Sequence, residues 1–116
     1  MSIQVGLEEL GSVAANQAPY AYFISVGDDH TAHMVAIRPA IGETDITCEV
    51  GRTSVANASV RPAVTLLWPP AAHDGYSLIV DGTARVEGDV VYVAPTRAVQ
   101  HRPAPGGGND CEPVKL

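Results

Sequence analysis

Short runs of alternating apolar and polar residues extend over most of the chain, and a period of two predicts β-strands rather than helices. In the first long run, Tyr22 and Ile24 would lie on one face of a strand, and Ala21 and Phe23 on the other. The predicted strands span residues 20–26, 31–38, 45–50, 63–68, 76–87 and 90–94. Strands at this regular spacing, separated by turn residues, indicate a mainly β fold: a six-stranded antiparallel barrel.

Three local features refine this strand pattern. The run 63–68 is nearly all apolar, which is typical of a strand buried on both faces. Gly82, inside the longest run, indicates a bulge or a close backbone approach. The segment 27–30, Gly-Asp-Asp-His, predicts a hairpin turn, because glycine and aspartate tolerate the left-handed backbone that such turns need.

Two segments depart from the period of two and predict helix. Leu7, Leu10 and Val13 repeat at helical spacing, so we expect one N-terminal helix over residues 6–16. A short inserted helix or irregular segment is expected at 53–60, between two strands. The domain itself is predicted to span 1–95, followed by an extended or mobile tail over 96–116 that is rich in proline and glycine.

Composition and charge narrow the function classes. A net charge of -6 argues against a general binder of nucleic acid or anionic membranes. The chain has no predicted signal peptide and no apolar run of about 18 residues, the length that a membrane helix needs, so we expect a cytoplasmic protein. Cys48 and Cys111 give neither a disulfide framework nor the spacing of a metal site, and Cys48 is expected to be a buried, inert thiol.

A polar segment between the third and fourth predicted strands is the main candidate site. Arg52, Thr53, Ser54 and Asn57 lie close together there, and a guanidinium with two hydroxyls suits an anion such as phosphate. An alternative is a plain helix start, with Thr53 or Ser54 as the N-cap residue. Arg38, at the end of a predicted strand, is either a partner for an anion or an ordinary surface arginine.

Four segments, in this order and spacing, resemble the flavin-binding split β-barrel family of pyridoxamine 5′-phosphate oxidase-like proteins. They are HMVAIR (33–38), GRTSVAN (51–57), RPAVTLLW (61–68) and YSLIVDGTARV (76–86). The resemblance covers residues 5–95 and implies a six-stranded split β-barrel with one N-terminal helix and a short inserted helix. It also implies a homodimer with the flavin at the interface between the two copies.

The resemblance assigns roles to individual residues. It implies that the cofactor phosphate contacts Arg38, Arg52, Thr53 and Ser54, and that the flavin ring lies along the backbone of Met34, Val35 and Ala36.

Two further residues have alternative roles. His33 would contact the phosphate or act as an acid, or would be a half-exposed strand histidine, which we favour. Trp68 would stack on the cofactor, lie at the dimer interface, or simply pack in the core.

Departures from the family pattern bear on the reaction. His33 replaces a usual arginine, Ser54 a usual lysine, and Ser77 and Ile79 replace polar substrate-contacting residues, so we do not expect pyridoxamine phosphate oxidase activity. The chain also shows no side-chain nucleophile pattern, which fits chemistry carried by a cofactor. The expected function is an FMN-binding oxidoreductase-like homodimer. The alternatives are a reductase that uses a deazaflavin of the F420 type, and a cofactor-free barrel that binds another small ligand or a protein partner.

Overall fold

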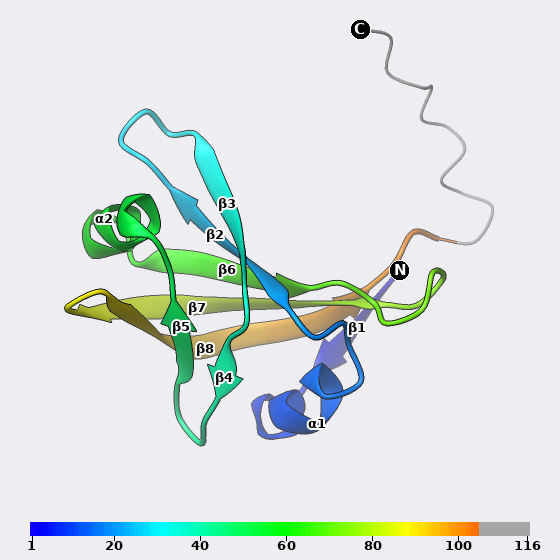
Figure 1. The fold of residues 1–116 in the computed structure, drawn as a ribbon. Helices are drawn as coiled ribbons and strands as arrows, with labels where there is room; N and C mark the ends of the chain where they lie inside the picture. The colour runs from blue at the N-terminus through cyan, green and yellow to red at the C-terminus, as the bar shows by residue number, and fades with distance from the viewer. Residues whose placement is uncertain (105–116) are drawn as a thin grey trace, which may run out of the picture.

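The computed structural model describes residues 1–104, and most of them form one strongly curved antiparallel sheet (Figure 1). The strands are β1 (Ser2–Val5), β2 (Ala21–Val26), β3 (Ala32–Ile37), β4 (Ala40–Ile41), β5 (Ile46–Glu49), β6 (Ala63–Trp68), β7 (Ser77–Glu87) and β8 (Val90–His101). The helical segments are the 3-10 turn η1 (Leu7–Glu9), α1 (Leu10–Ala14) and α2 (Arg52–Val60). The predicted split barrel with an N-terminal and an inserted helix is confirmed.

The sheet has the strand order β3-β2-β6-β7-β8-β5-β4, and β1 pairs with the far part of β8. Strands β1 and β4 were not expected from the sequence. Both are short. Strand β1 pairs with β8, which is distant in the sequence, and β4 pairs with β5 across a turn. Segments of two to four residues carry too little alternation to predict a strand.

The core lies on the concave side of the sheet and follows the alternation of each strand. Phe23 of β2 pairs with Leu66 of β6, Leu66 with Val80 of β7, and Val80 with Ala98 of β8; all four are buried. Tyr22 and Ile24, which flank Phe23, lie on the other face and are only half-buried. The same alternation corrects the expectation for 63–68, since this run is buried on one face only, with Val64, Leu66 and Trp68 inward.

The β7–β8 hairpin contains the bulge that Gly82 indicated. The register shifts between Asp81 and Gly82, and Gly82 faces Pro95 of β8. A strand tolerates proline at a bulge, because the missing N–H breaks no regular ladder bond there. This explains why β8 continues to His101 instead of ending at Ala94 as expected. Most of the predicted tail over 96–116, residues 105–116 with Cys111, lies outside the described residues.

Two turns connect adjacent strands as predicted, with one difference in detail. The backbone N–H of Gly27 donates to the carbonyl of Thr31 (3.0 Å), which closes the β2–β3 hairpin. The residue with the left-handed backbone is His30 (φ 63°), not one of the glycine or aspartates. Gly88 has φ 64° in the β7–β8 turn, a conformation that favours glycine. Among residues 1–104, no helix has the length and apolar character needed to cross a membrane.

Replacing Gly82 by alanine should destabilise the protein. An added Cβ would lie 2.5 Å from Cγ1 of Val93 and 2.7 Å from the carbonyl oxygen of Ala94, so the bulge would have to shift. Overpacking of this kind costs about 1–3 kcal/mol, measurable as a lower urea midpoint with an unchanged m-value. Gly11→Ala is the matched control, because nothing lies within 4 Å of its added Cβ. That control should be neutral or slightly stabilising; equal losses in both variants would contradict the packing argument.

Candidate functional site

Helix α2 begins without a side-chain cap. Its N-cap residue is Gly51, in extended conformation, and the first turn contains no acidic residue. The expectation that Thr53 or Ser54 caps the helix is therefore wrong; both lie inside the first turn. The first helical hydrogen bond runs from the N–H of Val55 to the carbonyl of Gly51 (3.0 Å), so the N–H groups of the preceding residues point out of the helix end. Such an end attracts anions.

The side chains of this first turn differ in exposure. Arg52 and Thr53 are exposed to solvent, whereas Ser54 is fully buried. The Oγ atom of Ser54 has no hydrogen-bond partner among the described residues. The three residues predicted together are thus adjacent in space, but only Arg52 and Thr53 present their side chains at the surface.

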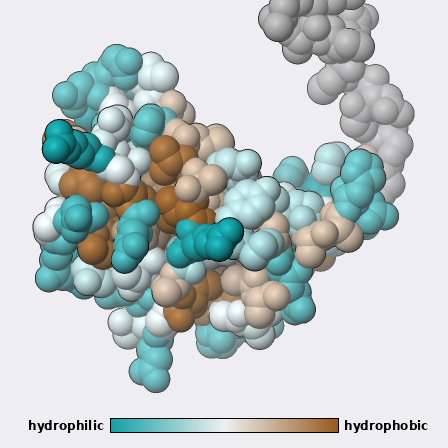
Figure 2. Space-filling view, in the orientation of Figure 1, coloured by the Kyte–Doolittle hydropathy of each residue, from teal (hydrophilic) through white to brown (hydrophobic). Residues whose placement is uncertain are grey.

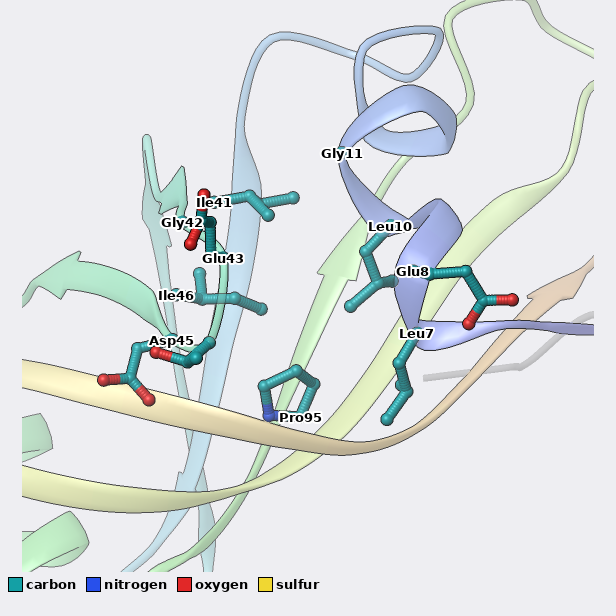
Figure 3. Close-up of a pocket in the computed structure, with 11 residues that line it drawn as sticks. Leu7, Glu8, Leu10, Gly11, Ile41, Gly42, Glu43, Asp45, Ile46 and Pro95 are labelled. Atoms are coloured by element: carbon teal, nitrogen blue, oxygen red, sulfur yellow. The ribbon is translucent and has the colours of Figure 1, made fainter.

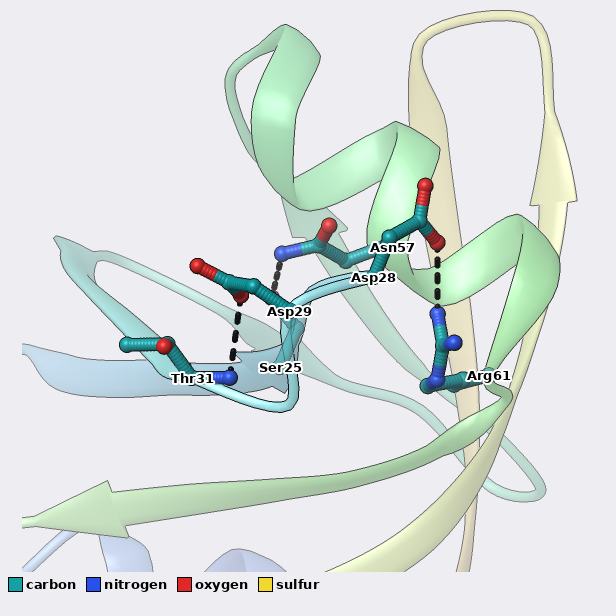
Figure 4. Close-up of polar contacts among 6 residues, drawn as sticks. All are labelled: Ser25, Asp28, Asp29, Thr31, Asn57 and Arg61. Atoms are coloured by element: carbon teal, nitrogen blue, oxygen red, sulfur yellow. Dashed lines mark hydrogen bonds and ion pairs between the residues drawn. The ribbon is translucent and has the colours of Figure 1, made fainter.

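Two contacts fix α2 against the β2–β3 hairpin (Figure 4). Nδ2 of Asn57 donates to Oγ of Ser25 (3.1 Å), and Ser25 is fully buried. At the end of the helix, Arg61 pairs with Asp28 in the hairpin turn (2.8 Å). Sequence reasoning did not identify this clamp, although Ser25, a polar residue on the inward face of a strand, was a usable signal. Asn57 therefore holds the helix in place.

Strand β3 has an open edge. It is the last strand of the sheet order, so β2 occupies one side and its other side has no strand partner among the described residues. Met34 is 55% exposed, Ala36 is exposed, and His33 and Val35 are half-buried. Unpaired backbone N–H and C=O groups on such an edge can bind the polar rim of a flat ring.

Arg38 lies at the other end of β3 from the α2 clamp. The clamp residue Ser25 pairs with His33, five residues before Arg38, which corresponds to about 16 Å along a strand. Arg38 lines two shallow pockets with Tyr20, and Trp68 borders one of them. Neither pocket includes Arg52, Thr53 or Ser54.

Trp68 is 4% exposed and belongs to the core cluster. This placement matches the core-packing alternative for Trp68, with only its edge reaching the pocket beside Arg38. The nearby rings of Tyr20 and Tyr22 pack edge to face, with centroids 5.7 Å apart.

Other reactive side chains do not form a site in the part of the chain that the structure describes. No group of three histidine, cysteine, aspartate or glutamate side chains there could hold a metal ion. Burial raises the pKa of the Cys48 thiol to about 12, so the nucleophilic thiolate is scarce near neutral pH. In the hairpin turn, the backbone N–H of Thr31 donates to Asp29 (3.0 Å) and lowers the pKa of that carboxyl.

Comparison with solved structures defines the fold class. An F420 reductase superposes with a TM-score of 0.64 at 15% identity, over 81% of this chain and 97% of that protein. A putative pyridoxamine 5′-phosphate oxidase from Listeria innocua gives 0.66 at 15% identity, over 80% and 96%. An FAD-binding protein from Mycobacterium smegmatis gives 0.62 at 18% identity, over 88% and 100%. The protein thus has the split β-barrel fold of pyridoxamine 5′-phosphate oxidase-like proteins, as the sequence resemblance implied.

Sequence comparison identifies nearer relatives. No family model matches the chain. Uncharacterized proteins of Mycobacterium bovis and Mycobacterium tuberculosis are each 39% identical to it over 119 residues, covering 87% of this chain and 82% of each relative. The chain belongs to the same family as these mycobacterial proteins.

The raised pKa of Cys48 predicts a thiol that is slow to react in the folded protein. In a Cys111→Ser variant at pH 8, a disulfide reagent should modify the native protein only as fast as it opens, and the unfolded protein at once. Because the folded pKa exceeds the unfolded value of 9.0, the contribution of this thiol to stability is complete below pH 9 and is lost as pH rises towards 12. Rapid modification of the native protein would show that Cys48 is accessible.

Proposed function

We propose that the protein binds a flavin-type cofactor, FMN in the first instance, and acts as an oxidoreductase. The observation that supports this proposal is the uncapped α2 N-terminus with the exposed Arg52, in a fold that also leaves the edge of strand β3 open. Solved proteins with this fold include ones described as an F420 reductase and an FAD-binding protein, which supports a flavin or deazaflavin as the ligand.

The residues at the site fit a mononucleotide. Arg52 and Thr53 are exposed donors at the positive end of α2, and the free N–H groups of the first turn add to them. The backbone from Met34 to Ala36 would line the ring, and His33 lies on the same strand nearer to α2. When bound, the flavin would supply hydride transfer. The chain would contribute orientation, charge neutralisation and exclusion of water.

In this proposal, Arg38 and Ser54 have other roles than the phosphate contacts expected from the sequence. Arg38 lies at the far end of β3, so it would meet the ring end of the cofactor or the substrate instead of the phosphate. Ser54 is buried, so its backbone N–H, rather than its hydroxyl, would serve the phosphate. Phosphate recognition then depends mainly on Arg52.

Arg52→Ala should weaken FMN binding about tenfold, because a charge-assisted hydrogen bond to phosphate contributes about 1.5–3 kcal/mol. Riboflavin, which has no phosphate, should bind the variant and the native protein equally. Flavin fluorescence titration measures all four affinities. Arg97→Ala is the control. Arg97 is an exposed residue of β8 that pairs with Asp81, and its replacement should leave FMN affinity unchanged.

A parallel titration with the deazaflavin F420 separates the alternatives. Tighter binding of F420 than of FMN would favour a deazaflavin-dependent reductase on the same site. If neither cofactor binds the native protein, the proposal fails and the barrel is a scaffold for another ligand or a protein partner.

We further propose that the protein is a homodimer, with the outer face of the sheet at the interface. Tyr22 of β2 pairs with Ala36 of β3 and Leu67 of β6, and Leu67 pairs with Ile79 of β7. These residues alternate with buried core residues, so they form a mostly apolar band on the opposite face. A continuous apolar band is typical of an interface. It adjoins β3, so a cofactor there would lie next to the second copy.

Ile79→Glu should convert the dimer to a monomer, because it places a charge in the middle of the apolar band. Sedimentation velocity over a range of concentrations measures the change. Ala72→Glu, an exposed position in the loop between β6 and β7, is the control and should leave the dimer intact. A native protein that sediments as a monomer at all concentrations would refute this proposal.

A further inference from the structure

A buried side-chain polar atom without a hydrogen-bond partner occurs at two places within residues 1–104. One is Oγ of Ser54, at the proposed cofactor site, and the other is Nε of Arg102, directly after β8. The groove of about 670 Å³ between η1–α1 and the β4–β5 hairpin contains no such atom. Figure 3 shows that the carboxylate of Glu8 is directed away from that groove. Outside the cofactor site, Arg102 is therefore the described group that most needs a partner.

Arg102 combines partial burial with the lack of a counter-charge. It is half-buried, and no carboxylate forms an ion pair with it within residues 1–104. Three other arginines of this range are paired and two are exposed to solvent: Arg61, Arg85 and Arg97 are paired, and Arg38 and Arg52 are exposed. Taking a charge out of water without a partner costs free energy, so an anion beside this guanidinium would be stabilising.

The guanidinium of Arg102 is held in position before any ligand binds. Its central carbon lies 4.4 Å from the centre of the Tyr76 ring, which is a cation–π contact. The backbone N–H of Arg102 donates to the carbonyl of Met1 (3.2 Å), and the N-terminal ammonium donates to the carbonyl of Arg102 (3.1 Å). A side chain that is already ordered loses little entropy when it binds a ligand.

Arg102 lines a pocket of about 470 Å³ at one end of the sheet. The other lining residues are Pro103 and, from the loop between β6 and β7, His73, Asp74 and Gly75. Figure 1 shows this loop beside the end of β8, close to the N-terminus. In Figure 2, the surface at the tip of this loop is hydrophilic. The volume is within the range of small-molecule sites.

We propose that this pocket binds a small organic carboxylate, which accepts hydrogen bonds from the guanidinium of Arg102. A guanidinium suits this class of ligand because its planar N–H groups match the two carboxylate oxygens. Since Nε is enclosed, the two terminal amino groups make these bonds. Gly75 and Pro103 contact the apolar body of the ligand. The pocket shares no residue with the proposed cofactor site, so failure of either proposal leaves the other unaffected.

Benzoate and its neutral isostere benzamide test the proposal on the full-length protein. NMR titration follows two signals of the site, the backbone amide of Gly75 and the Nε–H of Arg102, whose burial slows its exchange with water. Benzoate should shift both signals saturably, and benzamide should not. Added salt should weaken benzoate binding, because it screens the charge of the guanidinium.

Arg102→Gln should reduce benzoate affinity about tenfold, as measured at the Gly75 amide, because the charge-assisted hydrogen bonds are lost. Circular dichroism verifies that the variant is folded. Arg97→Gln is the matched control: it removes a cation of β8 that lies outside the pocket, and it should leave benzoate affinity unchanged.

Asp74→Asn tests the same pocket with Arg102 intact. Its carboxylate lies in the pocket wall, so its neutralisation should raise benzoate affinity about two- to threefold by removing a like charge. If benzoate binds this variant but not the native protein, Asp74 itself is the partner of Arg102 in solution, and the proposal is wrong.

Two further results would overturn the proposal. Equal shifts with benzoate and benzamide, or shifts that do not saturate, would contradict recognition of a carboxylate. Unchanged benzoate affinity in a folded Arg102→Gln variant would show that the guanidinium does not bind the ligand.

Discussion

The pairing of β7 with β8 is the constraint on which the rest of the structure depends. All 11 residues of β7 pair with β8. On their other edges, β7 pairs with β6, and β8 pairs with β5 and β1. The bulge at Gly82 bends this hairpin and lets Pro95 stay inside a strand. Without that bend, a long flat hairpin would not curl its inner face around Leu78, Val80 and Val91.

The open edge of the candidate cofactor site is a consequence of how this curved sheet ends. At one end, the order stops at β3, which leaves the open edge proposed for the flavin ring. Inside the sheet, β8 pairs with β5 over its first part and with β1 over its last part, and Pro95 lies between these two parts. Barrels that close completely have no such edges. The incomplete closure of this sheet therefore leaves polar backbone groups accessible along β3.

Sequence alone predicted the longer strands and both helical segments because their alternation and spacing are local. Local patterns could not predict β1 or β4, which need a partner strand to form. Pro95 led to the wrong end for the last strand. A strand can contain this proline only because of the bulge opposite it, at Gly82. At the candidate site, the sequence grouped Arg52, Thr53 and Ser54 correctly in one turn. It could not show that Ser54 faces inward, because that depends on Asn57 bonding Ser25, 32 residues away.

The first turn of α2 is basic although the chain as a whole is acidic. The chain carries a net charge of -6, yet the first turn of α2 has Arg52 and no acidic residue. In an acidic protein, a basic helix end without a counter-charge is costly unless an anion occupies it, since the unpaired N–H groups and the guanidinium reinforce each other. The local reversal of sign at α2 therefore favours an anionic ligand there.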